Sequence, residues 1–330
     1  MKFEYSKAEI ERVAREQNYT VNNVEKILRL SFILNDLNVM PEFKGKLLLK
    51  GGTAINLIAF DKLPRLSVDL DLDFAENLSK ERMQEEREKI NRPLDKYCQE
   101  NGYLKSGRCS FSLDSFSLFY TTATGSRDKL KLDINYHNRC HILEGEVSEI
   151  PFPFSMKDGV LTVAHVAVTE LFAGKIKAFY ERCKPRDIYD VYSLAKSGIL
   201  SSQEERNLLR QCIVFYSTLG NIEHPELLEQ DVSHILDMPF QDIKTQLLPM
   251  LHINAGKYPK DEINRIVIEY LSSLLKLEEA EKQYINEFYK GNYNPFLLFN
   301  DKTATTLLAH PVALRTQLQI KEMKEKISKN

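Results

Sequence analysis

The chain of 330 residues lacks the features that mark several classes of protein. Its five cysteines are scattered, and none belongs to a C-x-x-C pair. This argues against a disulfide framework or a zinc site and fits reduced thiols in a cytoplasm. The sequence contains no uninterrupted apolar run of about 18 residues, and its first residues include no apolar segment of the signal-peptide kind. We therefore expect a cytoplasmic protein without a membrane-spanning segment.

The sequence also lacks a strong charge of either sign, an internal repeat and a low-complexity tract. Its formal net charge is −2, with 43% hydrophobic and 28% charged residues, which is typical of a soluble globular protein. A balanced total argues neither for nor against nucleic acid, because a local basic patch can be hidden in it. The length allows one large domain or two ordinary ones.

Hydrophobic periodicity predicts an α+β protein. Residues 6–37 have the pattern of two helices, and a charged helix follows over 79–101, with an expected interruption at Pro93. Strands are expected at 47–49 and 67–74, and an antiparallel hairpin is expected from 111–124 and 129–137.

From about residue 163 onward the pattern is helical. Helices are predicted over 167–182 and 187–198, the second ending at Gly198. We therefore expect a mixed sheet flanked by helices in a domain of residues 1–200, followed by an all-helical domain of residues 201–330.

Three aspartates, Asp69, Asp71 and Asp73, alternate with apolar residues in the strand at 67–74. This pattern fits a strand with one solvent-exposed face, and it fits a cation-binding site equally well. Like charges side by side cost stability unless a cation neutralises them, and strands normally avoid Asp. An EF-hand loop is excluded, because its sixth position would be Phe74 instead of Gly and its twelfth Lys80 instead of Glu.

Magnesium fits this pattern better, since it prefers one or two carboxylates together with substrate phosphates. Two metal ions held by paired aspartates can stabilise both the attacking and the leaving oxygen of a displacement at phosphorus. Such a site usually takes a third carboxylate from a neighbouring strand. Asp133, on the polar face of the run KLKLDINY, is the well-placed candidate.

The turn Lys50-Gly51-Gly52-Thr53 lies between an apolar strand and the start of a helix. Glycines there let a phosphate approach the backbone, and the free N–H groups of a helix N-terminus attract anions. A Gly-Gly pair alone is a weak signal, but followed by Asp69-x-Asp71 it becomes more specific. It is not a P-loop, because no G-x-x-x-x-G-K-[ST] motif occurs.

In combination these motifs resemble the AbiEii toxin family and its MenT-type relatives, within the DNA polymerase beta superfamily of nucleotidyltransferases. The resemblance extends over residues 45–315 or so. It is carried by Lys50–Thr53, Arg65–Asp71, Leu132–Ile134, the stretch from Glu170 to Asp190, Asn292–Pro295 and His310-Pro311. One departure from the wider superfamily is visible: Gly-Gly replaces its Gly-Ser, and 16 residues separate it from D-x-D.

The resemblance implies the toxin of a bacterial toxin–antitoxin pair. Such an enzyme transfers nucleotides from an NTP, with Mg²⁺ or alternatively Mn²⁺, to an RNA acceptor, which for the MenT relatives is the 3′ end of tRNA. Translation and growth would be inhibited. The implied partners are NTP, tRNA and a cognate antitoxin encoded nearby.

The resemblance also implies roles for single residues. Asp69, Asp71 and Asp133 would bind metal and catalyse the reaction together with Lys175 and Asp187. The nucleotide would be bound by Lys50, Gly51, Gly52, Thr53, Ser67 and Lys175. Structural alternatives stay open for several of them: a surface position for Lys50, a strand-end cap for Ser67, a solvated helix face for Lys175, and a helix N-cap after Pro185 for Asp187. Asp73 is expected to support the site without binding metal.

Two other functions compete with this one. An enzyme of the same fold can act as a kinase or phosphorylate itself, in which case the γ-phosphorus of the nucleotide is attacked instead of the α-phosphorus. A non-catalytic RNA- or partner-binding module is the third possibility. The complete set of Asp69, Asp71 and Asp133 argues against it.

Overall fold

A computed structural model describes residues 3, 5–60, 63–155, 159–220, 228, 232–233, 238–252 and 258–329. Its contacts divide the chain into two compact units. Unit 1 comprises residues 1–139, 145–166 and 243–258, and unit 2 comprises residues 140–144, 167–242 and 259–330. The chain thus enters unit 2 first for residues 140–144 and again at residue 167, whereas the sequence led us to expect one boundary at residue 200.

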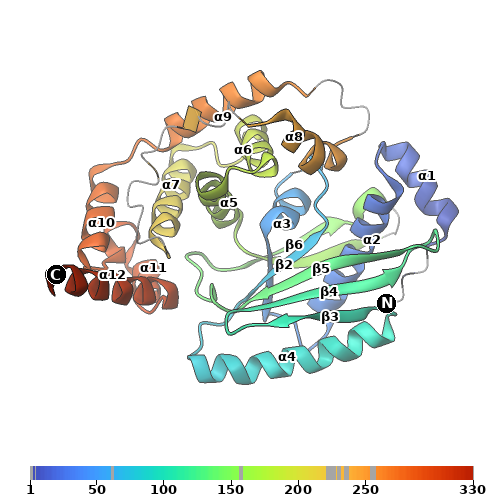
Figure 1. Cartoon of the computed structure of the whole chain (residues 1–330), viewed down its shortest axis with the longest axis horizontal. Coiled ribbons are helices and arrows are strands. Elements are labelled where there is room, and N and C mark those ends of the chain that lie inside the picture. Colours follow the sequence, from blue (N-terminus) through green and yellow to red (C-terminus); the bar gives the residue numbers. More distant parts are fainter. Residues whose placement is uncertain are drawn as a thin grey trace. The chain divides into compact units, whose positions relative to one another are not determined.

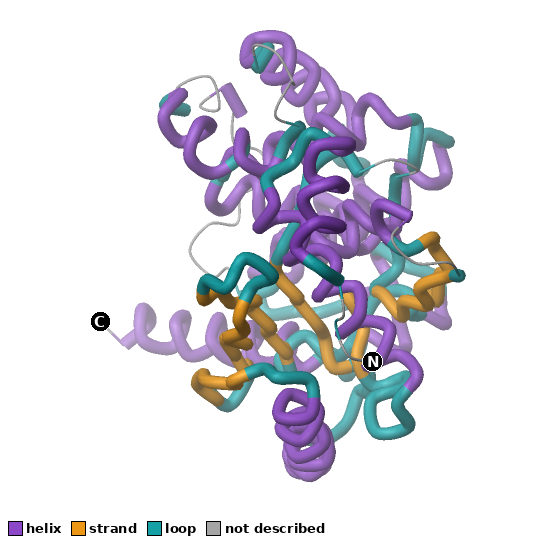
Figure 2. The backbone as a smooth tube through the Cα atoms, turned by 90° about the vertical axis from the view of Figure 1, so that its right-hand side faces the viewer, coloured by secondary structure: helices purple, strands orange, loops and turns teal. Residues whose placement is uncertain are grey.

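Unit 1 contains every strand of the described residues (Figures 1 and 2). Its helices are α1 (Lys7–Gln17), α2 (Val21–Val39), α3 (Gly51–Ile58) and α4 (Lys80–Glu100), with the short 3-10 turns η1 (Pro153–Ser155) and η4 (Leu248–Met250). Its strands are β1 (Leu47–Lys50), β2 (Asp69–Phe74), β3 (Leu104–Cys109), β4 (Leu113–Thr121), β5 (Arg127–Asn135), β6 (Glu146–Pro151) and β7 (Val160–His165).

The seven strands form one mixed sheet in the order β3-β4-β5-β2-β1-β7-β6. β2 lies at its centre, parallel to β5 and antiparallel to β1. β1 is parallel to β7, and the pairs β3–β4, β4–β5 and β6–β7 are antiparallel. The centre of the sheet therefore places β5 directly beside the aspartate strand.

Alternation along the strands separates a buried from a polar face. Leu70 and Leu72 of β2, Leu118 of β4, and Leu130 and Leu132 of β5 are all at most 2% exposed. Their neighbours along each strand point to the opposite face. The apolar set fixes the register, because a shift by one residue would turn the aspartates toward the apolar core instead.

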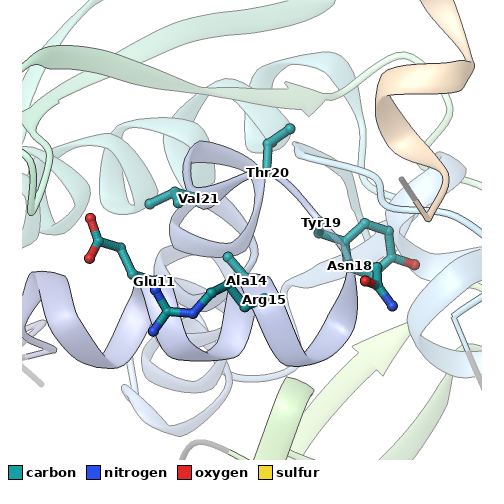
Figure 3. Close-up of a pocket in the computed structure, with 7 residues that line it drawn as sticks. All are labelled: Glu11, Ala14, Arg15, Asn18, Tyr19, Thr20 and Val21. Carbon is teal, nitrogen blue, oxygen red and sulfur yellow. The ribbon is translucent and has the colours of Figure 1, made fainter. Parts of the chain in front are cut away.

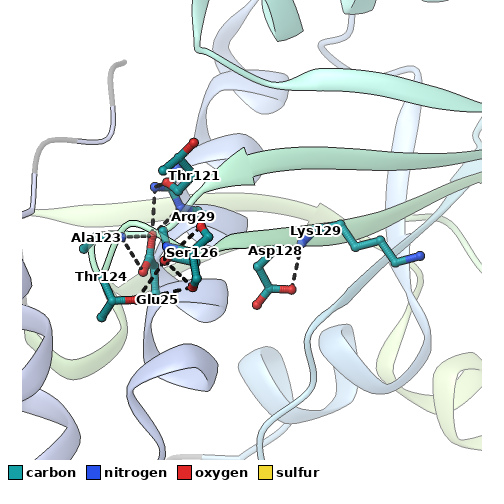
Figure 4. A network of polar contacts seen from close by, with 9 residues as sticks. Glu25, Arg29, Thr121, Ala123, Thr124, Ser126, Asp128 and Lys129 are labelled. Atoms are coloured by element: carbon teal, nitrogen blue, oxygen red, sulfur yellow. Dashed lines mark hydrogen bonds and ion pairs between the residues drawn. The ribbon is translucent and has the colours of Figure 1, made fainter.

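The turn between β4 and β5 is tied to α2 by a buried charged pair (Figure 4). Arg29 donates to Glu25 at 2.9 Å and to the carbonyl oxygen of Thr121 at 3.2 Å. Glu25 in turn accepts from the backbone N–H of Ala123. The Arg29 guanidinium also lies 4.1 Å from the centroid of the Tyr120 ring. These contacts fix the hairpin that carries β5 to the centre of the sheet.

The regular secondary structure of unit 2 is helical wherever the unit is described (Figure 1). Its helices are α5 (Val168–Arg182), α6 (Pro185–Ser197), α7 (Gln203–Thr218), α9 (Lys260–Leu274), α10 (Glu279–Lys290), α11 (Asp301–Leu307) and α12 (Pro311–Lys329), with the 3-10 turn η5 (Pro295–Leu297). Helix α8 (Phe240–Gln246) spans the point where the chain returns to unit 1. Within unit 2, α5 packs against α7 and α6 against α9, which is why α5 and α6 group with the C-terminal helices.

The predicted α+β class, the aspartate strand and the antiparallel hairpin are confirmed. Gly198 ends α6 in the left-handed conformation, also as predicted. The interruption at Pro93 is wrong, because α4 continues through it and keeps Ile90 and Leu94 buried on either side. The helical pattern expected from about residue 163 is wrong at its start, since β7 continues to His165. No helix among the described residues is long and apolar enough to cross a membrane.

Candidate active site

The carboxylates of two neighbouring strands converge in unit 1. In the pairing of β2 with β5, Asp71 lies opposite Asp133 and Asp69 opposite Lys131. In the pairing of β2 with β1, Asp71 lies opposite Lys50. Directly paired residues project to the same face of a sheet. The predicted metal ligands Asp69, Asp71 and Asp133 therefore lie on the same face of the sheet as Lys50.

Asp71 is at the centre of this group. Burial raises the pKa of its carboxyl above the ordinary value. The ammonium of Lys50 opposes the shift, whereas the negative charges of Asp69 and Asp133 add to it. A carboxylate held at low dielectric beside two others is short of positive charge. The site is therefore electrostatically suited to a cation.

Asp133 already has two partners from neighbouring positions. Ser115 of β4, which lies opposite Asp133, donates its hydroxyl to Oδ1 at 2.7 Å. The Lys131 ammonium lies 2.5 Å from Oδ2, and this hydrogen bond raises the pKa of Lys131. Among the described residues no three His, Cys, Asp or Glu side chains already surround one point as metal ligands. Lys131 thus occupies an oxygen of Asp133 that a metal ion would need.

The turn before α3 approaches these side chains closely. Gly51 has φ +70°, and a Cβ added to it would lie 2.6 Å from Asp71 Oδ2. A Cβ on Gly52 would lie 2.7 Å from Arg65 Nη2 and 3.0 Å from the Ser67 hydroxyl. The left-handed backbone of Gly51 favours glycine there, and a side chain at position 52 would have to displace Arg65 or Ser67. The predicted residues Gly51, Gly52 and Ser67 are brought together with Asp71.

Two buried side chains hold α3 to the segment that follows it. Thr53 donates its hydroxyl to the carbonyl oxygen of Asp69 at 2.5 Å. Asn56 donates to the carbonyl oxygen of Gly52 at 2.7 Å and accepts from the backbone N–H of Arg65 at 3.3 Å. Arg65 is 1% exposed. In the described contacts the Thr53 hydroxyl therefore positions the aspartate strand, whereas its predicted role was to cradle phosphate.

Lys50 pairs with the third aspartate of β2. Its ammonium lies 2.5 Å from Oδ1 of Asp73, whose side chain is 1% exposed. Asp73 thus fixes the charge of Lys50 next to Asp71.

Replacing Asp73 by asparagine is expected to lower the free energy of unfolding by about 1.5–3 kcal/mol, because a half-buried ammonium loses its charged partner. Urea unfolding without metal measures this change. Asp71→Asn is the matched comparison, as it makes the same chemical change on the same strand without breaking such a pair. Equal stability of Asp73→Asn and wild type would show that the pair is inconsequential.

Sequence reasoning gave no role to Asn56, Ser115 or Lys131. The position of Lys131 beside Asp133 could have been predicted from the sequence, because it lies two residues before Asp133 and so on the same face of a strand. The contacts of Ser115 and Asn56 depend on the strand register and on the path after α3, which a single sequence does not encode locally.

The two remaining predicted residues, Lys175 and Asp187, meet in unit 2. The Lys175 ammonium lies 3.0 Å from carboxylate oxygens of both Asp187 and Asp190, and all three side chains are at most 8% exposed. Arg182 also donates to Asp187. Burial alone would raise the pKa of Asp187, but Arg182 and Lys175 hold it below the ordinary value. The solvated helix face considered for Lys175 is therefore wrong.

Asp187 is not a helix N-cap. The cap of α6 is Lys184, Pro185 occupies the first turn, and no side chain caps the helix. Asp187 directs its carboxylate to Lys175 and Arg182 instead.

Glu170 of α5 is an equally buried carboxylate. It accepts from the backbone N–H of Leu143, binds the ring of His141 at 3.0 Å, and accepts a hydrogen bond from Tyr216. It ties residues 140–144 to helices α5 and α7.

A separate pocket of about 540 Å³ lies at the turn between α1 and α2 (Figure 3). It is lined by Glu11, Ala14, Arg15, Asn18, Tyr19, Thr20 and Val21. None of the predicted site residues is among them.

Comparisons with known proteins identify the family and the fold. The sequence model of the family described as "Nucleotidyl transferase AbiEii toxin, Type IV TA system" matches residues 33–284. Among solved structures, the chain is similar to the nucleotidyltransferase toxin MenT4 from Mycobacterium tuberculosis H37Rv, with a TM-score of 0.62 and 16% sequence identity. The match covers 93% of this chain and 99% of the MenT4 chain. No curated protein sequence matches. At this identity the likeness to MenT4 establishes the fold alone, and it confirms the expected nucleotidyltransferase fold.

Proposed function

Since the chain belongs to the AbiEii family of nucleotidyltransferase toxins of type IV toxin–antitoxin systems, we propose that it transfers nucleotides from an NTP to the 3′ end of tRNA in a Mg²⁺-dependent reaction. Membership of the family implies an NTP substrate and an antitoxin partner. The proposal adds the acceptor, the metal and the residues that act.

The observation that carries the proposal is the placement of Asp71. It lies opposite Asp133 on one neighbouring strand and opposite Lys50 on the other, with Gly51 against its carboxylate. Carboxylates beside a glycine turn that opens a helix suit a metal-bound triphosphate, because the turn offers backbone N–H groups to phosphate. This arrangement supports nucleotide chemistry over a structural role for the aspartates.

The charge of the three carboxylates suits a divalent cation, whereas their described side-chain positions are not gathered as metal ligands. Asp71 is half-buried beside Asp69 and Asp133, and its raised pKa reflects a deficit of positive charge that such an ion would offset. Asp69, Asp71 and Asp133 would hold Mg²⁺, with Mn²⁺ as the alternative. When bound, the ion would supply Lewis-acid stabilisation of charge on the phosphate oxygens.

The side chains of this unit then have distinct tasks. Gly51 and Gly52 admit the triphosphate to the backbone, and Ser67 donates a hydrogen bond to it. Lys50, fixed by Asp73, adds positive charge near the phosphates. Asp133 accepts the proton of the acceptor 3′-hydroxyl as its oxygen bonds to the α-phosphorus, and the bond from that phosphorus to the β-phosphate oxygen breaks, releasing pyrophosphate.

Lys175 and Asp187 remain proposed catalytic residues on the strength of the family resemblance. In unit 2 their side chains form one buried ion network, so each also stabilises the fold. A loss of activity on mutation must therefore be separated from a loss of structure.

The proposed reaction is tested with purified protein, Mg²⁺, total tRNA and each α-³²P-labelled NTP in turn. We expect label on tRNA with at least one nucleotide, and no label with the Asp71→Asn variant. Omitting Mg²⁺ should abolish the label, and adding Mn²⁺ instead tests the alternative ion.

Two other outcomes would overturn the proposal. Absence of label on tRNA with all four nucleotides would exclude nucleotidyl transfer to this acceptor. Transfer of label to the protein or the RNA from γ-³²P-labelled ATP or GTP, and not from α-labelled nucleotides, would establish the kinase reaction in its place.

A further inference from the structure

The polar face that carries the aspartates continues outward over three strands. Because β5 pairs with β4 and β4 with β3, the residues that share the face of Asp133 follow from the register. We call this surface the open face. It consists of Leu104, Ser106 and Arg108 of β3, Leu113, Ser115, Ser117, Phe119 and Thr121 of β4, and Arg127, Lys129, Lys131, Asp133 and Asn135 of β5.

The open face is accessible in its outer part. Leu104 is 59% exposed, and the side chain of Lys131 is 51% exposed. The reverse side of the same strands is closed, since Phe116, Leu118 and Leu132 are at most 5% exposed. Figure 1 shows β3, β4 and β5 side by side. The exposed apolar and charged groups thus belong to one side of the sheet.

The charge of the open face is one-sided. Its cations are Arg108, Arg127, Lys129 and Lys131, and Asp133 is its one acidic residue. These strands are described throughout, so the count holds for the whole surface. This surface lies next to the cluster of aspartates that is proposed to act on NTP. Its positive charge makes it complementary to a polyanion.

An aromatic ring lies among these cations. Phe119 is paired with Lys129 on one side and with Leu104 on the other. The Lys129 ammonium is 5.7 Å and the Arg127 guanidinium 5.9 Å from the ring centroid. Figure 4 shows the Lys129 side chain extending away from the buried Glu25–Arg29 pair. A partly exposed ring flanked by two cations suits a base and its adjacent phosphates.

We propose that the open face binds the single-stranded 3′ segment of the acceptor RNA, with a base stacked on Phe119 and the phosphates held by Arg127, Lys129 and Lys131. Lys129 and Asp133 are four residues apart, which is about 13 Å along a strand. A few nucleotides can cover this span and bring the terminal hydroxyl to Asp133. The inference rests on the proposed function, since it says where the acceptor of that reaction binds.

The arrangement also gives Lys131 a second state. In the described structure its ammonium binds Asp133. When RNA and metal bind, Lys131 turns from the carboxylate to a phosphate and frees the oxygen of Asp133. Once Lys131 has moved, the open face extends without interruption from Phe119 to the aspartates.

The test is the binding of a fluorescent single-stranded RNA of twelve nucleotides with a free 3′ end, measured by anisotropy in Mg²⁺ without NTP. Phe119→Leu keeps an apolar side chain but removes the stacking surface. It is expected to weaken binding about 5- to 160-fold, as stacking contributes roughly 1–3 kcal/mol per base and each 1.36 kcal/mol is a factor of ten. Phe119→Tyr should retain binding within about threefold, since an aromatic face is restored.

Matched controls separate the surface from general effects. Phe111→Leu makes the same change at an exposed phenylalanine in the turn before β4, and binding should not change. Lys129→Met should reduce the dependence of log Kd on log salt by about one. Lys96→Met removes the same charge from an exposed side chain of α4 and should leave that slope unaltered.

The outcomes distinguish this inference from the proposed function. NTP binding, followed by calorimetry, should be the same in Phe119→Leu and wild type. If wild type labels tRNA while Phe119→Leu and Lys129→Met bind and use RNA as wild type does, the inference is wrong and the reaction stands. If these variants lose binding of a protein antitoxin and keep RNA binding, the open face is a protein interface and the inference is likewise wrong. RNA binding that depends on Phe119 without any transfer of label supports the surface and overturns the reaction.

Discussion

An Asp71→Asn variant is expected to lose at least about 10³-fold in nucleotidyl transfer while folding at least as well as the wild type. The loss follows because the amide keeps the shape of the carboxyl but removes the charge at the centre of the carboxylate group, between Asp133 and Lys50. Stabilisation of phosphate charge by a bound cation contributes several kcal/mol, and each 1.36 kcal/mol changes a rate tenfold. The label assay with α-³²P NTP measures the loss.

The stability of Asp71→Asn follows from the raised pKa of Asp71. A carboxyl whose folded pKa is raised favours folding fully below the unfolded pKa, and this contribution is lost as pH rises through the folded pKa. At neutral pH without metal, wild type thus carries a half-buried charge that the variant lacks. The Tm of Asp71→Asn should equal or exceed that of wild type at pH 7, and its advantage should shrink as the pH falls through the raised folded pKa toward the unfolded carboxyl pKa of about 4, below which no further change is expected.

Calorimetry in EDTA between pH 4 and pH 7 checks this expectation, and a second series with Mg²⁺ provides the control. The ion should raise the Tm of wild type more than that of the variant, since a ligand stabilises the state that binds it. A variant that is both less stable than wild type in EDTA and insensitive to pH would contradict the view that Asp71 is kept for chemistry at a cost in stability.

The aspartate strand shows what local sequence determines. Alternation alone predicted β2, because Leu70 and Leu72 must be buried and the intervening aspartates must share the other face. The partnership of Asp71 with Asp133 was likewise accessible, since the apolar residues of β5 fix which face Asp133 occupies. Signals that repeat along a strand are therefore readable without a structure.

Contacts that depend on how distant segments pair were not readable in this way. Two contacts depend on the antiparallel register of β1 and β2. One is the hydrogen bond that the Thr53 hydroxyl donates to the carbonyl oxygen of Asp69, and the other is the ion pair between Lys50 and Asp73. Strands β3, β6 and β7 were missed for a related reason. β3 and β6 lie at the edges of the sheet, where few of their residues are buried, so their sequences lack a strong alternation. β7 runs directly into a helical pattern.

The buried ion network of unit 2 gives the second large effect. Lys175→Met is expected to lower the free energy of unfolding by about 3–5 kcal/mol, because the carboxylates of Asp187 and Asp190 stay buried while their shared ammonium is lost. Arg182 still pairs with Asp187, which places the effect toward the lower end. Chemical denaturation at pH 7 measures it.

Lys177→Met is the matched control, since Lys177 lies on the same helix and its partner Glu181 has a side chain that is 42% exposed. A pair of that kind contributes less than about 1 kcal/mol. If both variants lost the same free energy of unfolding, the buried Lys175 network would contribute no more to stability than an exposed ion pair.

A triple variant separates the structural role of Lys175 from a catalytic one. Combining Lys175→Met with Asp187→Asn and Asp190→Asn removes the buried charges together, and replacing a whole buried network costs far less than breaking it. The pKa of Asp187 is lowered in the wild type, so its contribution is present above the unfolded carboxyl pKa and lost as the pH falls through the folded pKa. The triple variant should therefore regain most of the stability at pH 7, show a weaker dependence on pH than wild type, and still transfer no nucleotide. Recovery of activity together with stability would show that Lys175 and Asp187 act only by holding the helices of unit 2.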